Sequence, residues 1–286
     1  MAVTGEYQVR PAVIRDRERL THLIFDEGSA AHRHLDWRTP LEWVGYPPYF
    51  VIEQNGLIES VLACPDDPPG IAWVRVFASG ESIQMQDAWN ILWEHVRKFF
   101  DGKGNTVVCV ITLQDWFKKI LESSKFRTQQ QIVMLTWTGM MSPKEKHPGG
   151  IKLRKMEEED IPNVAKLDAA AFEPLWQNTE QALHKAFSQA YVVTVVELEG
   201  KIAGYQLSTK NLIGGHLARL AILPELQGRG IGHLLVADMI HQFTRKGIHS
   251  ISVNTQSDNP ASLSLYKRIG FIETGERFAV YEFEMK

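Results

Sequence analysis

The sequence is poor in cysteine and has no strong charge of either sign. Cys64 and Cys109 are the only cysteines in 286 residues, too few for a disulfide framework, and both lie in apolar runs typical of buried thiols. The formal net charge of −3 offers no electrostatic basis for binding nucleic acid or an anionic membrane. We expect neither of these partners, and we expect no metal site.

Long apolar runs are also missing. The first residues, MAVTGEYQVR, contain no apolar signal core, and no stretch approaches the ~20 apolar residues that span a bilayer. We therefore expect a soluble, cytoplasmic protein. Apolar residues still make up 44% of the chain, which is enough to form substantial cores. The length exceeds the roughly 100 to 200 residues of one domain, so two domains are expected.

An internal repeat supports two domains. Three segments of the first half have counterparts about 145 residues later, with the same order of strands, turns and helices. The pairs are YQVRPAVIRDRERLTHLI with IKLRKMEEEDIPNVAKLD, YFVIEQNGLIESVLA with YVVTVVELEGKIAGYQLS, and TVVCVITLQDWFKKILESSKF with SISVNTQSDNPASLSLYKRIGF. The second pair predicts two hairpins with tight turns at Asn55-Gly56 and Glu199-Gly200. Two copies of one α/β unit are the simplest explanation.

The segment between the copies has the composition of a linker. GMMSPKEKHPGG, residues 139–150, is polar and rich in proline and glycine. We therefore predict domains at 1–138 and 151–286. Each half contains both hairpins and strand–helix–strand connections, which together predict an α/β fold with a mixed sheet and helices on its faces.

A glycine-rich turn in the second half suits an anion. HLARLAIL predicts a strand and GHLLVADMIHQF a helix, and QGRGIG, residues 227–232, joins them. A helix start carries unpaired N–H groups and a partial positive charge, and glycines leave them accessible to a pyrophosphate. A turn without a ligand is the alternative. The spacing does not fit the dinucleotide pattern G-x-G-x-x-G, and the Gly-Lys-Ser/Thr of a Walker loop is absent.

This turn resembles the acetyl-CoA-binding motif of the GCN5-related N-acetyltransferases (GNAT). The family pattern Q/R-x-x-G-x-G/A appears as Gln227, Gly230 and Gly232. A second family pattern, N-x-A-x-x-x-x-Y-x-x-x-G-F, appears in NPASLSLYKRIGF from Asn259, where its tyrosine is Tyr266. The second half looks most like the ribosomal-protein-alanine acetyltransferase branch. The resemblance implies two tandem GNAT folds and acetyl-CoA as cosubstrate.

The resemblance also implies which residues hold acetyl-CoA. The pantetheine chain would pair with the backbone of a strand, as an added peptide strand does, and the glycine turn would hold the pyrophosphate. Asn259 would cap its helix or reach the cosubstrate. The candidate cosubstrate residues are Leu220, Ala221, Ile222, Leu223, Gln227, Gly228, Arg229, Gly230, Ile231, Gly232, Asn259 and Ser262.

The family reaction is direct attack of an amine on the thioester. Tyr266 matches the family's general acid, because a phenol can protonate the departing thiolate. A backbone N–H near Ile222 is the expected oxyanion donor. The base is open: His216 falls at the position of a family glutamate, while Glu173 and Glu180 lie in a loop that lines the acceptor site in the family. Trp176 in that loop is expected to line the acceptor pocket or to pack in the core.

The first half lacks this chemistry. Gln84 and Gln86 fall where Gly230 and Gly232 stand in the second half, and their side chains would fill the space of the phosphates. Leu121 takes the place of the tyrosine and Gln114 that of Asn259. The first half is therefore predicted to be a degenerate, non-catalytic GNAT-like domain.

Three functions remain open at this point. The leading one is an acetyl-CoA-dependent N-acetyltransferase acting on a small-molecule or peptide amine. An acyl-CoA-binding sensor or structural protein without catalysis needs only the glycine turn and the strand. A transferase for a longer acyl-CoA differs only in the acyl pocket. The acceptor cannot be read from the sequence, because the loops that select it vary freely on one fold.

Overall fold

The computed structural model describes residues 7–25, 30–139, 143 and 149–285. Most of the predicted linker, residues 140–142 and 144–148, lies outside these ranges.

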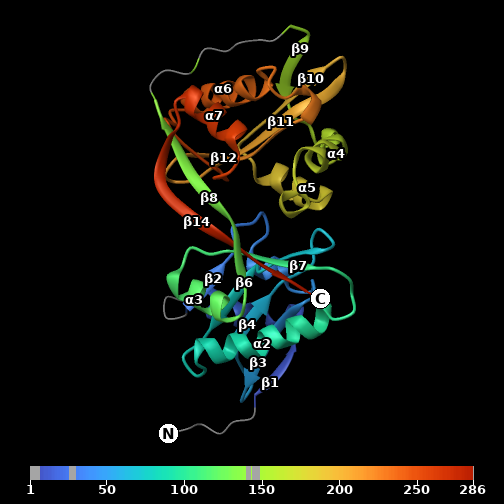
Figure 1. The fold of residues 1–286 in the computed structure, drawn as a ribbon, viewed down its shortest axis with the longest axis vertical. Helices are drawn as coiled ribbons and strands as arrows, with labels where there is room; N and C mark the ends of the chain where they lie inside the picture. The colour runs from blue at the N-terminus through green and yellow to red at the C-terminus, as the bar shows by residue number, and fades with distance from the viewer. Residues whose placement is uncertain (1–6, 26–29, 140–142, 144–148, 286) are drawn as a thin grey trace. The chain divides into compact units, whose positions relative to one another are not determined.

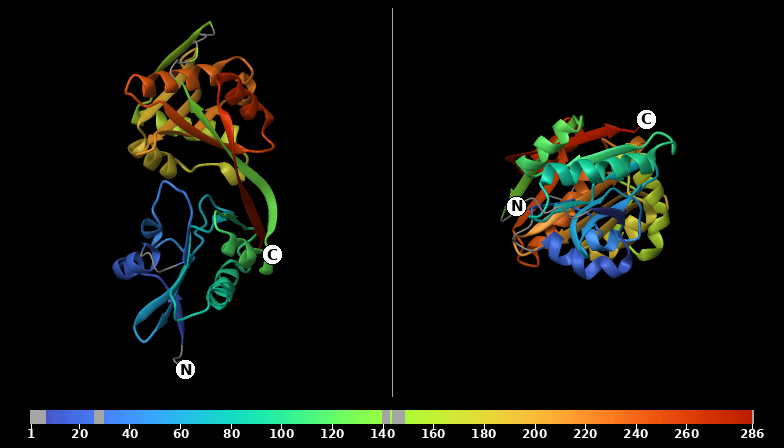
Figure 2. Two further views of the ribbon diagram at one scale, coloured as in Figure 1. Left: turned by 90° about the vertical axis from the view of Figure 1, so that its left-hand side faces the viewer. Right: turned by 90° about the horizontal axis from the view of Figure 1, so that it is seen from below.

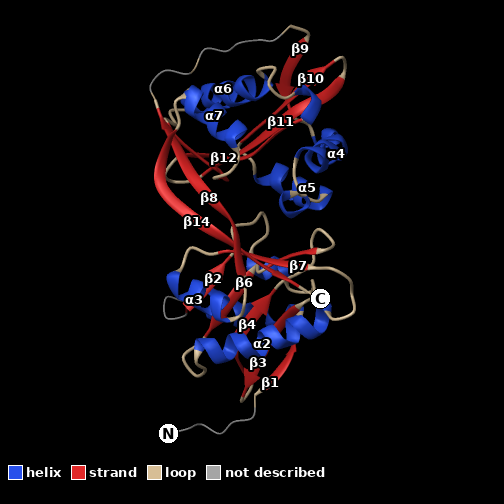
Figure 3. Ribbon diagram, in the orientation of Figure 1, coloured by secondary structure: helices blue, strands red, loops and turns tan. Residues whose placement is uncertain are grey.

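Figures 1 and 3 show the elements. The strands are β1 (Gln8–Pro11), β2 (Ala30–Arg33), β3 (Tyr49–Gln54), β4 (Leu57–Ala63), β5 (Ile71–Trp73), β6 (Val76–Ser79), β7 (Val107–Ile111), β8 (Arg127–Thr138), β9 (Ile151–Lys155), β10 (Val192–Leu198), β11 (Lys201–Lys210), β12 (Gly215–Ile222), β13 (Ser250–Gln256) and β14 (Ile272–Glu284). The helices are α1 (Arg17–Phe25), α2 (Met85–Phe100), α3 (Asp115–Ser123), α4 (Ile161–Ala171), α5 (Glu180–Gln189), α6 (Ile231–Thr244) and α7 (Pro260–Ile269).

The chain forms two compact units whose limits differ from the predicted domains. Unit 1 contains Met1–Gln129 and Phe278–Lys286, and unit 2 contains Gln130–Arg277. Most of β8, from the first half, therefore belongs to unit 2, where it pairs with β13. The end of β14, from the second half, belongs to unit 1, where it pairs with β7. The halves thus exchange a strand, which the sequence pattern does not reveal because it does not specify a strand's partner.

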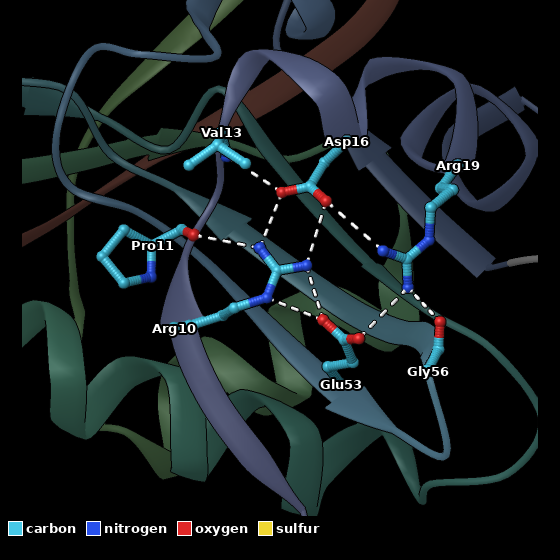
Figure 4. Close-up of polar contacts among 7 residues, drawn as sticks. All are labelled: Arg10, Pro11, Val13, Asp16, Arg19, Glu53 and Gly56. Atoms are coloured by element: carbon cyan, nitrogen blue, oxygen red, sulfur yellow. Dashed lines mark hydrogen bonds and ion pairs between the residues drawn. The ribbon is translucent and has the colours of Figure 1, made fainter.

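An arginine-centred cluster occurs once in each unit. In unit 1, Arg10 binds both oxygens of Asp16 at 2.7 and 2.9 Å and donates from Nε to Glu53 at 2.7 Å (Figure 4). The backbone N–H of Val13 also donates to Asp16, over 2.9 Å. In unit 2, 144 positions later, Arg154 binds Asp160 and Glu197 through the same atoms at 2.6 to 2.8 Å. The arginine ties the first strand, the turn after it and the first hairpin together in each unit.

The hairpins repeat with the same offset. Asn55 and Gly56 have φ of 51° and 78°, and Glu199 and Gly200 have φ of 51° and 75°. Positive φ at both central residues is the geometry of a type I′ turn, which confirms both predicted hairpins. The register shifts after Ile52 in the β3–β4 pair and after Val196 in the β10–β11 pair, again 144 positions apart. The internal duplication predicted from the sequence is thus present in backbone detail.

The five-stranded sheet of unit 1 is covered on both faces. Its order is β1-β3-β4-β6-β2. Alternate residues face opposite ways, so Val51 and Val61 pack with α1 while Ile52 and Leu62 pack with α2. Figure 2, left, shows α1 and α2 on the two sides of these strands. The α2 face contains Trp89, which is fully buried and stacks on Trp93 at 5.5 Å.

Strand β2 occupies one edge of this sheet. β5 pairs in parallel with β7 as far as Trp73, after which the chain continues as β6. β6 pairs with β4 on one side and antiparallel with β2 on the other, where Ala30 lies opposite Ser79 and Arg33 opposite Val76. The unit's own chain therefore fills both hydrogen-bonding edges of β6.

Unit 2 is a mixed sheet between two helical layers. Its strands follow the order β14-β8-β13-β12-β11-β10-β9, with β12 and β13 parallel. The apolar residues of α6, including Leu234, Met239 and Phe243, are buried as their spacing predicts. Helix α4 contacts β11 and β12 on the face opposite to α6. Neighbouring residues of β11 show this, since the Tyr205 hydroxyl reaches Asp168 of α4 and Gly204 faces Ile231 of α6. Among the described residues, no helix is long and apolar enough to cross a membrane.

Candidate active site

One cavity of about 950 Å³ lies within unit 2. It is bounded by the end of β12, the glycine turn, the first turns of α6 and α7, and the segment after α4. Its lining residues are Gln130, Ala171, Phe172, Glu173, Trp176, Leu220, Ala221, Ile222, Leu226, Gln227, Gly228, Gly230, Ile231, Gly232, His233, Gln256, Asp258, Asn259, Pro260, Ala261, Ser262, Ser264, Leu265 and Arg268. All the predicted cosubstrate residues except Leu223 and Arg229 are therefore brought together here.

The end of β12 offers an unpaired edge to the cavity. β12 pairs with β13 only from Gly215 to Leu217. Its register on β11 then shifts, since Leu217 lies opposite Ser208 and Arg219 opposite Leu207, which leaves Ala218 as the extra residue. From there to Ile222, within the part of the chain that the structure describes, β12 pairs only with β11. Backbone groups on the other side are available to an extended ligand.

The glycines of the turn have different physical roles. Gly228 and Gly230 have φ of 75° and 86°, which side-chain-bearing residues rarely adopt. Gly232 lies inside α6, where a Cβ would approach Leu265 to 3.1 Å and Ile222 to 3.3 Å. Two glycines therefore shape the turn, and the third allows α6 to pack closely against α7 and β12.

The N-terminus of α6 is open at the cavity, whereas that of α7 is capped. Helix α6 begins after Gly230, and none of the side chains that the structure describes caps it. Helix α7 is capped by Asn259, whose Oδ1 accepts a hydrogen bond from the Ser262 backbone N–H at 3.0 Å. The first residues of α6, Ile231, Gly232 and His233, line the cavity, and the first N–H groups of a helix have no partner within the helix. Of the two roles predicted for Asn259, capping is observed.

Tyr266 lies in the core of unit 2 and is not one of the cavity-lining residues. It is 4% exposed, and its ring packs against Phe271 with ring centroids 5.6 Å apart. Burial raises the pKa of its hydroxyl above the ordinary value, so the phenol stays protonated at neutral pH. Its neighbour Leu265 does line the cavity. Tyr266 and Leu121 occupy equivalent positions in the two units. The Phe271 backbone N–H donates to the Tyr266 carbonyl, and the Phe126 N–H donates to the Leu121 carbonyl, each at 3.0 Å.

His216 is not at the cavity. It lies in the paired part of β12, opposite Ser252, and its Nδ1 is 2.9 Å from the Ser252 hydroxyl. Burial lowers the pKa of its imidazole, which favours the neutral ring. Glu180 is the exposed first residue of α5, outside the lining. Of the candidate bases, the structure places only Glu173 at the cavity.

Sequence reasoning missed several lining residues. Gln130 comes from β8, more than 90 positions before the glycine turn, and no local pattern links the two. It accepts a hydrogen bond from the Trp176 indole N–H at 3.1 Å. Arg268 could have been predicted from the sequence, because it lies at helical spacing after Ala261 and Leu265, on one face of α7. No group of three or more His, Cys, Asp or Glu suited to a metal occurs in the described ranges.

A family model described as acetyltransferase (GNAT) domain matches residues 153–285. The second half of this chain is a GNAT domain. The [ribosomal protein bS18]-alanine N-acetyltransferase of Haemophilus influenzae is 28% identical to it over 127 residues, which cover 41% of this chain and 86% of the relative. The mycothiol acetyltransferase of Arthrobacter sp. is 33% identical over 91 residues, which cover 30% of this chain and only 28% of that protein.

The solved structures extend the likeness to both halves. A tandem GNAT protein from the clavulanic acid biosynthesis pathway superposes with a TM-score of 0.67 at 14% identity, covering 98% of this chain and 99% of that one. The fold is therefore two tandem GNAT folds, as the sequence predicts. Family and fold together indicate an acyltransferase that transfers an acyl group from acyl-CoA to an amine.

Proposed function

We propose that this protein is an acetyl-CoA-dependent N-acetyltransferase whose active site is the cavity of unit 2. One observation carries the proposal: the unpaired edge of β12 and the open N-terminus of α6 meet at the same cavity. The edge suits the amide groups of pantetheine, and the helix start suits a pyrophosphate. Few ligands other than an acyl-CoA combine these two chemical features.

Acetyl-CoA binds with its pyrophosphate over the first N–H groups of α6. The backbone of Leu220 to Ile222 pairs with pantetheine and brings the thioester toward Glu173 and Trp176, which also line the cavity. Arg268, on α7, adds a cationic group to the same lining. The acetyl group, as opposed to a longer acyl chain, is part of the proposal.

The amine attacks the thioester carbonyl directly. A C–N bond forms, the C–S bond breaks, and a backbone N–H near Ile222 stabilises the oxyanion. We assign to Tyr266 the proton that the departing thiolate takes, because Tyr266 stands at the tyrosine of the family pattern; its hydroxyl is buried and it is not one of the residues that line the cavity. Glu173, a carboxylate that lines the cavity and one of the bases considered from the sequence, takes the proton that the amine loses.

Unit 1 takes no part in this chemistry. Helix α2 begins after Gln84, as α6 begins after Gly230, but without a glycine turn. Residues Val76–Ser79 lie 144 positions before Leu220–Leu223, and β2 pairs with their edge. In unit 1, β2 therefore occupies the strand edge that corresponds to the proposed pantetheine site of unit 2. This supports a single acyl-CoA site in each chain.

The acceptor is an amine of a small molecule or a peptide. A relative named for acetylating the alanine of ribosomal protein bS18 makes peptides with an N-terminal alanine a first choice. Phe172 and Trp176 are aromatic side chains that line the cavity, and they can pack against an apolar substituent on the amine.

The test is CoA release from acetyl-CoA by the purified chain across a panel of amines. The panel contains alanine-initiated peptides, polyamines, amino sugars and arylalkylamines. We expect at least one amine to raise CoA release about 100-fold over the amine-free rate. Binding of acetyl-CoA without release on any amine would instead support the non-catalytic sensor. Faster release from butyryl-CoA or octanoyl-CoA than from acetyl-CoA would overturn the acetyl assignment.

A further inference from the structure

The carboxylate of Asp168 joins three elements of unit 2. Asp168 lies on α4 and is fully buried. Arg219 of β12 donates to it from Nε and Nη2, both at 2.8 Å, and the Tyr205 hydroxyl of β11 donates to Oδ2. A buried charge needs partners of this kind, because desolvation of an unpaired ion is costly. No motif in the sequence marks these three residues as functional.

The same ion pair holds a segment that lines the cavity. Arg219 Nη2 also donates to the Trp176 carbonyl at 2.6 Å, and the Asn178 backbone N–H donates to Asp168 at 2.9 Å. The guanidinium of Arg219 lies 3.5 Å from the centroid of the Phe172 ring. Residues 172–178, which we call the acceptor segment, contribute Phe172, Glu173 and Trp176 to the cavity lining. Arg219 itself immediately precedes the cosubstrate residues of β12.

The repeat shows what is particular to unit 2. Arg75, 144 positions before Arg219, is buried and, like Arg219, lies against an aromatic ring, that of Trp43, at 4.7 Å. Its carboxylate partner is Asp36, at 3.2 Å, from the segment after β2. Both units thus keep an arginine at this position of the repeat, within β12 in unit 2 and directly before β6 in unit 1. In unit 1 this arginine binds the segment after β2, and in unit 2 it binds a segment that lines the cavity.

We propose that Arg219 and Asp168 are positioning residues that fix the acceptor segment against the cavity. A guanidinium that binds both carboxylate oxygens and a backbone carbonyl sets distance and orientation together. Arg219 thereby fixes the positions of Trp176 and Glu173 relative to the thioester, which Leu220 to Ile222 hold. The expected effect on the amine rests on the proposed acyl-transfer function. The positioning of the acceptor segment can be measured without an amine.

The experiment uses the full chain labelled with 5-fluorotryptophan. The Trp176 fluorine resonance, one of eight tryptophan signals, is assigned with Trp176→Phe. Arg219→Lys keeps the positive charge but cannot make the forked contacts. We expect it to shift or broaden the Trp176 resonance and to leave the signals from unit 1 in place. Acetyl-CoA affinity should change less than about threefold, because the cosubstrate residues are untouched.

Arg75→Lys is the matched control. It makes the same substitution at the repeated position and should perturb the Trp43 resonance while leaving that of Trp176 unchanged. Tyr205→Phe removes a single hydrogen bond to Asp168 and should give a smaller shift of the Trp176 signal, which covers the case in which Arg219→Lys does not fold. With an amine from the panel, Arg219→Lys should raise KM for the amine about tenfold, with KM for acetyl-CoA little changed.

An unchanged Trp176 resonance in both Arg219→Lys and Tyr205→Phe would overturn the inference. Equal loss of amine and acetyl-CoA binding in Arg219→Lys would also overturn it, because it would indicate a general structural defect. If the wild-type chain binds no acetyl-CoA, the proposed function fails, and the fluorine signals still decide whether Arg219 positions the segment.

Discussion

Gly230→Asp is expected to weaken acetyl-CoA binding about 100-fold while the chain remains folded. Asp and Asn tolerate positive φ better than other side-chain-bearing residues, and Gly230 has φ of 86°. A carboxylate at the start of α6 also interacts favourably with the helix dipole. A phosphate about 6 Å away, at an effective dielectric constant of about 20, is repelled by about 3 kcal/mol, or about 100-fold in affinity. Calorimetric titration with acetyl-CoA measures the loss.

Gly230→Asn is the control that separates charge from shape. It has nearly the same size and backbone preference as Asp, so we expect it to lose less than about tenfold in affinity. Gln84→Asp makes the corresponding change at the start of α2 in unit 1 and should leave acetyl-CoA binding unchanged. Equal losses for Asp and Asn would assign the effect to the backbone, and wild-type affinity in Gly230→Asp would place the pyrophosphate elsewhere.

Tyr266→Phe is expected to lower kcat about 100-fold with little change in acetyl-CoA affinity. The substitution removes only the hydroxyl, and the ring packed against Phe271 is retained. A general acid contributes in the transition state, when the thiolate leaves, so its loss appears in turnover and not in binding. Steady-state kinetics with the best amine of the panel, together with calorimetry, check both parts.

Tyr281→Phe controls for the loss of a buried tyrosine hydroxyl. Tyr281 is also 4% exposed, but it belongs to unit 1, where its hydroxyl donates to Glu122 at 3.1 Å. Turnover should be unchanged in this variant. Wild-type turnover in Tyr266→Phe would remove Tyr266 as the acid and direct attention to groups that line the cavity.

The fold was predictable from the sequence because its signals are local and occur twice. Positive-φ turns at Asn55-Gly56 and Glu199-Gly200, strand alternation and the apolar face of α6 each depend on neighbouring residues. The exchange of β8 and β14 was not predictable, because a strand's sequence encodes its two faces and not the identity of its neighbour.

The site was predictable where a motif carries it and not where distant segments meet. The glycine turn and Asn259 are encoded by local spacing. Asp168 and Arg219 lie 51 positions apart on different elements and meet only through the tertiary fold. Similarly, the glutamines of unit 1 indicated a lost site, but only the structure reveals that β2 occupies the edge of β6.

We propose that each chain binds one acyl-CoA and that unit 2 alone holds it. Isothermal titration of the full chain with acetyl-CoA, in the wild type and in Gly230→Asp, tests it most directly. We expect one site per chain in the wild type and about 100-fold weaker binding at that site in the variant. Two sites per wild-type chain, or one site that persists at full affinity in Gly230→Asp, would contradict it.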